Sequence, residues 1–362
     1  MIRIIKPYIK YEDVEADIKE IFKTKQLTKG PFVTKFTEAL SDYTQAKYVH
    51  LTSSATTALS TCLELINIKK GDEVIISDFS FPATANVVEN IGAKPIFADV
   101  EIDTYNMDPT HLKSLINRQT KAVIFVDALG NPSNLLEVKK ICEEHNIILI
   151  EDAACSIGSS INHKKIGNIA DLTCFSFHPR KLLTTGEGGA ILTNSTKWNE
   201  ALNILLNHGA TVCNQQVEFN SSGFNYRLPD LACVLGIHQL KILDQIIERR
   251  LELKKKYQSA LEPLGFTLQT VKEPVKHNVQ SIVFTTPNNI NRNTLIQYLY
   301  DHQIETTIGT YSLSQTSYYL KKYQSPQPSS LFLQNHTITL PCHDDVPFDY
   351  VIEVIQNYRT NE

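Results

Sequence analysis

The feature of this chain that most constrains its fold is an alternation of short apolar runs with amphipathic helical patterns. Helical patterns at residues 83–91 and 135–145 lie between apolar runs that are typical of buried strands. The predicted strands are residues 48–51, 73–76, 95–100, 122–126 and 147–150. Repetition of strand, helix and strand predicts βαβ units, and so an α/β fold with a mostly parallel sheet covered by helices on both faces. In such sheets, ligands bind beyond the carboxyl ends of the strands.

A lysine and an aspartate stand at two of these strand ends. Asp152 follows the apolar run at 147–150, and Lys181 follows a further predicted strand at 172–177, before a Gly-rich reversal leads into a strand at 190–193. A lysine in a crowded, dry pocket loses its proton more easily and can form a Schiff base. The best-known use is attachment of pyridoxal phosphate (PLP), whose ring nitrogen is paired with an acidic side chain. Taken singly, Lys181 could be a solvated loop lysine and Asp152 a helix N-cap.

Two further positions suit a flat, phosphorylated ligand. The strand at 48–51 leads through Ser54, Thr56 and Thr57 into a helix. A helix start offers free N–H groups and a partial positive charge, which favour a phosphate, although these residues could simply cap the helix. Phe81 follows another strand, where its ring could stack on a heterocycle or close the core.

The composition excludes several classes of protein. The net charge is −4 and no basic cluster is visible, which argues against nucleic-acid binding. The first twenty residues carry charges and a proline, and no run of eighteen apolar residues occurs, so neither a signal peptide nor a membrane span is expected. The seven cysteines are scattered without a Cys-x-x-Cys pair. This favours the cytoplasm and argues against a disulfide framework and against a metal site.

The length of 362 residues predicts two domains. We expect a large ligand-binding domain at residues 1–240 and a smaller C-terminal α+β domain at 241–362, joined by a long helix near 230–257.

Smaller features are also predicted. The polar stretches at 210–223 and 323–330 are expected to be loops, and the longer one to be a binding loop. The helix predicted at 12–22 is expected to bury one face made of Val14, Ile18, Ile21 and Phe22.

Motifs along nearly the whole chain resemble those of one family. They are IKP at 5–7, LTKGP at 27–31, GDEV at 71–74, FPATAN at 81–86, GNP at 130–132, EDAA at 151–154, SFHPRK at 176–181, TGEGG at 185–189, NHG at 207–209 and GFNYR at 223–227. In this order they resemble the DegT/DnrJ/EryC1/StrS sugar aminotransferases, which are PLP enzymes of the aspartate aminotransferase fold, fold type I.

The resemblance implies a role for each matching position. Lys181 would carry the cofactor as a Schiff base and shuttle a proton, and Asp152 would pair with the ring nitrogen. The other implied cofactor contacts are Ser54, Ala55, Thr56 and Ser176 at the phosphate, Phe81 on the ring face and Cys155 near the phenolic oxygen. Asn225, or Arg227 in its place, would reach the phosphate of the neighbouring subunit, which implies a homodimer with shared active sites.

The sequence departs from the family's pattern in three places. Ala55 replaces a frequent glycine, Cys155 replaces a frequent His or Gln, and Ser314 replaces a frequent histidine. A helix-start N–H survives the change at Ala55, whereas a thiol is a weak hydrogen-bond partner, which puts the contact of Cys155 with the cofactor in doubt.

The implied reaction transfers an amino group, with glutamate as the expected donor, to a nucleotide-activated keto-deoxysugar, giving an amino sugar for surface polysaccharide or glycoconjugate. Lys29, His178 and Tyr311 are the candidate substrate contacts, and His178 could equally be a structural histidine. A deoxysugar dehydratase, an aminotransferase for a cyclitol or another non-nucleotide substrate, and a non-catalytic binding protein remain alternatives. Related dehydratases replace the lysine by histidine, so Lys181 favours transamination.

Overall fold

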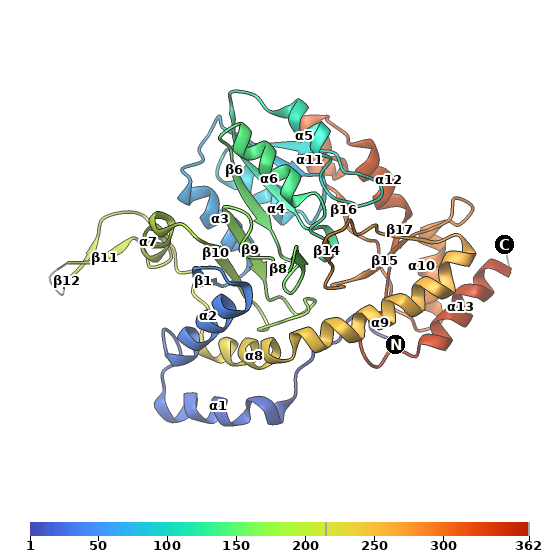
Figure 1. Ribbon diagram of the computed structural model, residues 1–362, viewed down its shortest axis with the longest axis horizontal. Coiled ribbons are helices and arrows are strands. Elements are labelled where there is room, and N and C mark those ends of the chain that lie inside the picture. Colours follow the sequence, from blue (N-terminus) through green and yellow to red (C-terminus); the bar gives the residue numbers. More distant parts are fainter. Residues whose placement is uncertain (214–215, 361–362) are drawn as a thin grey trace.

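The computed structural model describes residues 1–213 and 216–360, and its centre is a seven-stranded sheet (Figure 1). The strand order is β1 (Tyr48–Thr52), β10 (Gly189–Thr193), β9 (Leu172–Ser176), β6 (Ile148–Asp152), β5 (Thr120–Val126), β2 (Glu73–Ser77) and β4 (Lys94–Ala98). Strand β10 is antiparallel to both of its neighbours, and the other neighbouring pairs are parallel. The predicted, mostly parallel sheet is therefore confirmed, and Asp152 is the last residue of β6.

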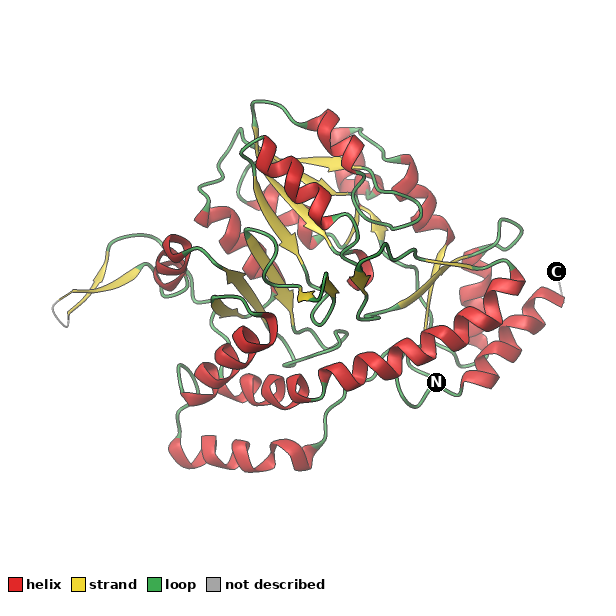
Figure 2. Cartoon of the chain, viewed as in Figure 1, coloured by secondary structure: helices red, strands yellow, loops and turns green. Residues whose placement is uncertain are grey.

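Helices cover both faces of this sheet, as the strand-helix alternation predicted (Figure 2). Helices α2 (Pro31–Thr44), α6 (Leu135–Glu144) and α8 (Asp230–Lys241) supply side chains to the hydrophobic cluster of one face. Helices α3 (Ala55–Leu65), α4 (Ala83–Asn90) and α7 (Thr196–Leu205) supply the cluster of the other face. The strands can be continuously apolar because both of their faces are buried in this way.

The N-terminal helix α1 (Tyr11–Thr24) packs on α8 and corrects one prediction. Val14 and Ile21 are buried and Ile18 is partly buried, but Phe22 is 65% exposed. Successive residues of a helix are rotated by 100°, so Phe22 points well away from the line through Val14, Ile18 and Ile21.

The long helix predicted near 230–257 is instead two helices, α8 and α9 (Leu243–Leu261), which are separated at Ile242. Helices α10 (Arg292–Asp301) and α13 (Phe348–Thr360) and strands β13 (Thr267–Leu268), β15 (Ile282–Thr285) and β17 (Thr337–Leu340) follow α9 in the chain. Their side chains form a hydrophobic cluster of their own, to which Ile2 at the N-terminus also packs. The domain boundary at residue 240 stays a prediction.

The predicted loop at 210–223 contains a β-hairpin, β11 (Ala210–Cys213) and β12 (Gln216–Phe219), which projects from the body of the protein beyond α7 (Figure 1). Val217 and Phe219 favour a strand, yet they are 60% and 70% exposed. Helix α12 (Pro328–His336) likewise begins inside the second predicted loop.

The remaining elements are short. They are α5 (Pro109–Leu115), α11 (Ser317–Tyr323), the 3-10 turns η1 (Ala128–Gly130), η2 (Glu262–Leu264) and η3 (Leu313–Gln315), and strands β3 (Phe79–Ser80), β7 (Ser160–Ile161), β8 (Lys164–Lys165), β14 (Val275–Lys276) and β16 (Tyr311–Ser312). Over the described residues, no helix combines the length and apolar character that crossing a membrane requires.

Candidate active site

Asp152 presents a buried carboxylate at the carboxyl end of β6. The Thr84 hydroxyl donates to Oδ2 at 2.8 Å, and the Ala154 N–H donates to Oδ1 at 3.3 Å. Burial raises the pKa of Asp152, whereas the Thr84 hydrogen bond and the positive charge of Lys181 lower that pKa. The two hydrogen bonds therefore fix the orientation of the Asp152 carboxylate, and Lys181 is close enough to influence its charge.

Lys181 lies in the loop between β9 and β10, and its amine points to the segment that follows Asp152. Its Nζ donates to the Cys155 Sγ at 3.0 Å. The loop is held by its own main chain, since the Lys181 N–H donates to the His178 carbonyl at 2.8 Å and the Thr185 N–H donates to the Phe177 carbonyl at 3.0 Å. The structure thus brings together Lys181, Cys155 and Asp152, which the sequence could only place at separate strand ends.

The start of α3 provides a group of hydrogen-bond donors near the end of β1. Ser54 is the N-cap, as the alternative interpretation proposed, and its hydroxyl accepts from the Thr57 N–H at 3.1 Å in a capping box. Within the described chain, no hydrogen bond engages the N–H groups of Ala55 and Thr56. Capping therefore leaves two amides at the positive end of the helix free to bind an anion.

Gly189 allows this helix start to lie close to the sheet. It pairs with Thr52 of β1 on one side and with Ser176 of β9 on the other, so only β10 separates Ser176 from the end of β1. A Cβ atom at Gly189 would lie 2.5 Å from the Ser54 carbonyl carbon and 2.7 Å from the Ala55 nitrogen. The Ala55 and Thr56 amides, Ser176 and Gly189 together form what we call the anion cradle.

Phe81 and Tyr311 form an exposed aromatic pair. They come together because β3 pairs with β16, with Tyr311 opposite Ser80, and their ring centroids lie 6.4 Å apart. Phe81 is 65% exposed and Tyr311 is 43% exposed, so both rings are accessible to a ligand. Their roles in ring stacking and substrate binding stay predictions.

His178 and Asn225 have few contacts. The His178 Nδ1 accepts from the Arg180 N–H at 3.1 Å, and its Nε2 lies 3.9 Å from a Glu187 carboxylate oxygen. Asn225 is exposed, but the next residue runs past the cradle of its own chain, because the Tyr226 carbonyl accepts from the Ser53 N–H at 2.7 Å. A contact of Asn225 with a neighbouring subunit stays a prediction.

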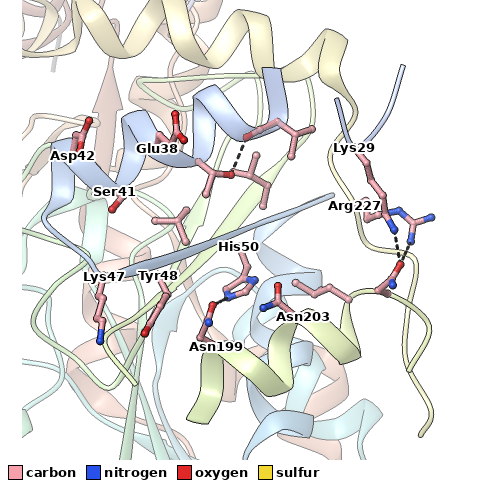
Figure 3. A pocket seen from close by; sticks show the side chains of 16 residues that line it. Lys29, Glu38, Ser41, Asp42, Lys47, Tyr48, His50, Asn199, Asn203 and Arg227 are labelled. Carbon is pink, nitrogen blue, oxygen red and sulfur yellow. Dashed lines mark hydrogen bonds between the residues drawn. The ribbon is translucent and has the colours of Figure 1, made fainter. Parts of the chain in front are cut away.

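Lys29 lies in a cavity that neither Lys181 nor Asp152 lines. The cavity has a volume of about 660 Å³ and lies along β1 between α2 and α7 (Figure 3). The Lys29 Nζ and the Arg227 guanidinium both donate to the Asn207 Oδ1, at 2.6 and 3.5 Å. The predicted role of Lys29 in substrate binding has no support from this placement and stays a prediction.

Sequence reasoning did not assign three residues that shape the site: Thr84, Gly189 and Gln280. Thr84 lies in the FPATAN motif and Gly189 in the TGEGG motif, so both belong to recognised motifs, but no function could be assigned to either residue from the sequence. Gln280 hydrogen-bonds to the main chain on both sides of Lys181. Nothing near Gln280 in the sequence signals that contact.

The groups gathered here fit pyridoxal phosphate. A buried carboxylate suits a protonated ring nitrogen, an amine suits the aldehyde, and an uncapped helix start with a nearby hydroxyl suits the phosphate. All three come from chain segments that meet at the carboxyl ends of β1, β6 and β9.

Comparison with known proteins gives consistent results. The sequence profile of the DegT/DnrJ/EryC1/StrS aminotransferase family matches residues 8–359. The chain is 30% identical to the UDP-4-amino-4,6-dideoxy-N-acetyl-beta-L-altrosamine transaminase of Helicobacter pylori, over 95% of this chain and 93% of that protein. It is 29% identical to the GDP-perosamine synthase of Vibrio cholerae, over 91% of this chain and 92% of that protein.

The fold comparison agrees. The solved structure of Helicobacter pylori PseC, an aminotransferase involved in the biosynthesis of pseudoaminic acid, matches with a TM-score of 0.93 and 27% identity, over 99% of both chains. The predicted α/β architecture of the fold type I enzymes is therefore confirmed over the whole sheet and its flanking helices.

Proposed function

The chain belongs to the DegT/DnrJ/EryC1/StrS aminotransferase family, and from this premise we propose that it is a PLP-dependent aminotransferase acting on a nucleotide-activated keto sugar. Glutamate is the proposed amino donor. The product would be an amino sugar used for a surface polysaccharide or glycoconjugate.

One observation supports this proposal most directly. The Lys181 Nζ is 3.0 Å from the Cys155 Sγ, and the Lys181 charge is near enough to lower the pKa of the buried Asp152 carboxylate. A non-catalytic binding protein has no need of a lysine and a carboxylate in this relation, and a dehydratase of this family would carry histidine in place of Lys181.

The residues would divide the work as follows. Bound PLP supplies an electron-withdrawing ring that acidifies the carbon next to the amine. Asp152 would accept a hydrogen bond from the ring nitrogen, with Thr84 and Ala154 holding its carboxylate in place. Lys181 would hold the cofactor covalently and move a proton to and from the substrate carbon with its Nζ.

The anion cradle would hold the phosphate end of the cofactor. The Ala55 and Thr56 amides and the Ser176 hydroxyl would donate to the phosphate oxygens, and these contacts are stronger than neutral ones because the acceptor is charged. Phe81 would stack on the ring face, where its exposed side chain stands free of the core.

The substrate class rests on the relatives, which include a UDP-sugar transaminase and a GDP-perosamine synthase. The proposal also includes a cytoplasmic homodimer in which Asn225 reaches the partner's cofactor. Exposed Val217 and Phe219 on the projecting hairpin are consistent with contact to a second copy.

The first test is the attachment of the cofactor. Purified protein mixed with PLP should show the absorbance band of a lysine-bound cofactor, and Lys181→Ala should abolish that band. Lys113→Ala removes an exposed lysine on α5 and is the matched control that should leave the band intact. A normal band in the Lys181 variant would remove the basis of the proposal.

The second test concerns the reaction. Loaded protein should convert glutamate to 2-oxoglutarate once per site, and a screen of nucleotide keto sugars should then yield a product whose mass shows an added amine. Loss of water without an added amine would favour the dehydratase. Turnover of a cyclitol but of no nucleotide sugar would show that the substrate class is a different one. Failure to react with any amino donor would favour a non-catalytic binding protein.

A further inference from the structure

One short segment of the C-terminal part of the chain grips both loops of the candidate site. Gln280 is buried, and its side chain bonds to the main chain on either side of Lys181. Its Nε2 donates to the Arg180 carbonyl at 2.8 Å, and its Oε1 accepts from the Leu182 N–H at 3.0 Å. An amide that donates to one flank and accepts from the other restrains the peptide units that carry Lys181.

The same segment holds the loop that contains Cys155. The Asn278 Nδ2 donates to the Cys155 carbonyl and to the Ile157 carbonyl, both at 2.8 Å. The Asn278 Oδ1 accepts from the Gln280 main-chain N–H at 2.9 Å, which ties the Asn278 side chain to the main chain of Gln280. Residues 278–280 therefore determine how the Lys181 loop and the Cys155 loop lie relative to each other.

The segment adopts a backbone that needs outside support. Val279 is fully buried with φ of 55°, a left-handed conformation that a β-branched residue rarely adopts. Arg250 of α9 provides that support, because its Nη1 donates to the Val279 carbonyl at 3.1 Å and to the Gln280 carbonyl at 3.0 Å. Gly130 leaves the necessary room, since a Cβ there would lie 2.2 Å from the Asn278 Oδ1. Such strain persists where the surrounding structure determines it strongly, often beside functional groups.

We propose that Gln280 is a positioning residue for Lys181, which sets the lysine amine against Cys155 and Asp152 by clamping the main chain on both sides of it. The inference rests on the proposed function, in which Lys181 carries the cofactor and moves the proton. It adds a physical link between the C-terminal part of the chain, through Arg250 and residues 278–280, and the reacting amine. No step of the reaction passes through Gln280 itself.

The test compares two variants of buried glutamines. Gln280→Met keeps the length of the side chain and removes the clamp. Gln269→Met is the matched control, because Gln269 is also buried and donates to two main-chain carbonyls, those of Thr104 and Ala128, away from the Lys181 loop. In cofactor-free protein, brief acetic anhydride labelling read by peptide mass spectrometry reports the access and reactivity of Lys181. Labelling of Lys181 should rise several-fold in Gln280→Met and stay at the wild-type level in the control.

The loaded enzyme gives a second measurement. Because a displacement of about 1 Å in a reacting group can cost a hundredfold in rate, kcat should fall roughly ten- to a hundredfold in Gln280→Met, with the KM for the amino donor little changed. If both glutamine variants label and turn over alike, the positioning role is refuted. If wild-type protein shows no lysine-bound cofactor, the proposed function fails instead, and the labelling of cofactor-free protein still decides the role of Gln280.

A second variant covers the case in which Gln280→Met does not fold. Gln280→Glu keeps the acceptor for the Leu182 N–H, and its carboxyl can donate to the Arg180 carbonyl only when it is protonated. The excess labelling of Lys181 over wild type should therefore shrink as the pH falls. An excess that does not change with pH, or no excess at any pH, would overturn the proposal.

Discussion

Gly189→Ala should weaken binding of the cofactor's phosphate without disturbing the lysine or the carboxylate. The new Cβ would lie 2.5 Å from the Ser54 carbonyl carbon and 2.7 Å from the Ala55 nitrogen, and ordinary contact begins near 3.4 Å. The start of α3 must therefore retreat from β10 by about 0.9 Å, because main-chain atoms cannot rotate away as a side chain does. The Ala55 and Thr56 amides move with it.

The magnitude follows from the hydrogen bonds that this movement stretches. A hydrogen bond to a charged group contributes about 1.5–3 kcal/mol, so weakening the two amide contacts should cost about 2 kcal/mol of binding energy, which is roughly 30-fold in Kd. Overpacking between β10 and α3 should also lower the free energy of unfolding by about 1–3 kcal/mol.

The assay compares titrations with PLP and with pyridoxal, which lacks the phosphate. Gly189→Ala should raise the Kd for PLP and leave the Kd for pyridoxal nearly unchanged. Gly186→Ala, in the loop that precedes β10, is the control, because its Cβ meets nothing within 4 Å, although its φ of 86° makes any side chain strained. It should lose stability yet keep the preference for PLP. Equal loss of affinity for PLP and pyridoxal in Gly189→Ala would refute the proposal that the anion cradle binds the phosphate.

Two further predictions concern stability. Burial raises the pKa of Asp78 to about 6 from an ordinary value of 3.8. The free energy of unfolding should therefore fall by about 3 kcal/mol as the pH rises from about 4 to about 6. Asp78→Asn should flatten that part of the pH profile in urea titrations, and an unchanged slope would contradict this pKa shift. Asp230 accepts from the Gly30 and Phe32 N–H groups at 2.9 and 3.0 Å and so caps α2 from a distant part of the chain. Asp230→Ala should lower the free energy of unfolding by about 2–3 kcal/mol in the same urea titrations. A loss below about 0.5 kcal/mol would show that water replaces the cap.

The sequence by itself was enough to predict the central sheet and to place a candidate aspartate and a candidate lysine near the ends of two of its strands. Apolar runs predicted the strands of the central sheet because a strand buried on both faces must be apolar along its length. Asp152 and Lys181 could be singled out as candidates because each stands shortly after such a run, and the helix start at Ala55 because capping depends on neighbouring residues. These are local signals, and local signals can be found by inspecting adjacent residues.

Local signals also set the limits of those predictions. Phe22 was predicted to lie on the buried face of α1, but it is exposed. The break between α8 and α9 at Ile242 was not predicted, because no glycine or proline marks it. The stretch at 210–223 was predicted to be a loop because of its many Asn, Gln and Ser residues, and two isolated strands such as β11 and β12 are only marginally stable.

The tertiary structure alone decided which distant groups hold the site together. Thr84 reaches Asp152, Asp230 reaches the start of α2, and Gln280 reaches both flanks of Lys181. A hydrogen bond needs atoms within about 3 Å in a defined direction. Which elements come that close depends on how the helices and strands pack, whereas the pattern along the chain reports only which of their faces are buried.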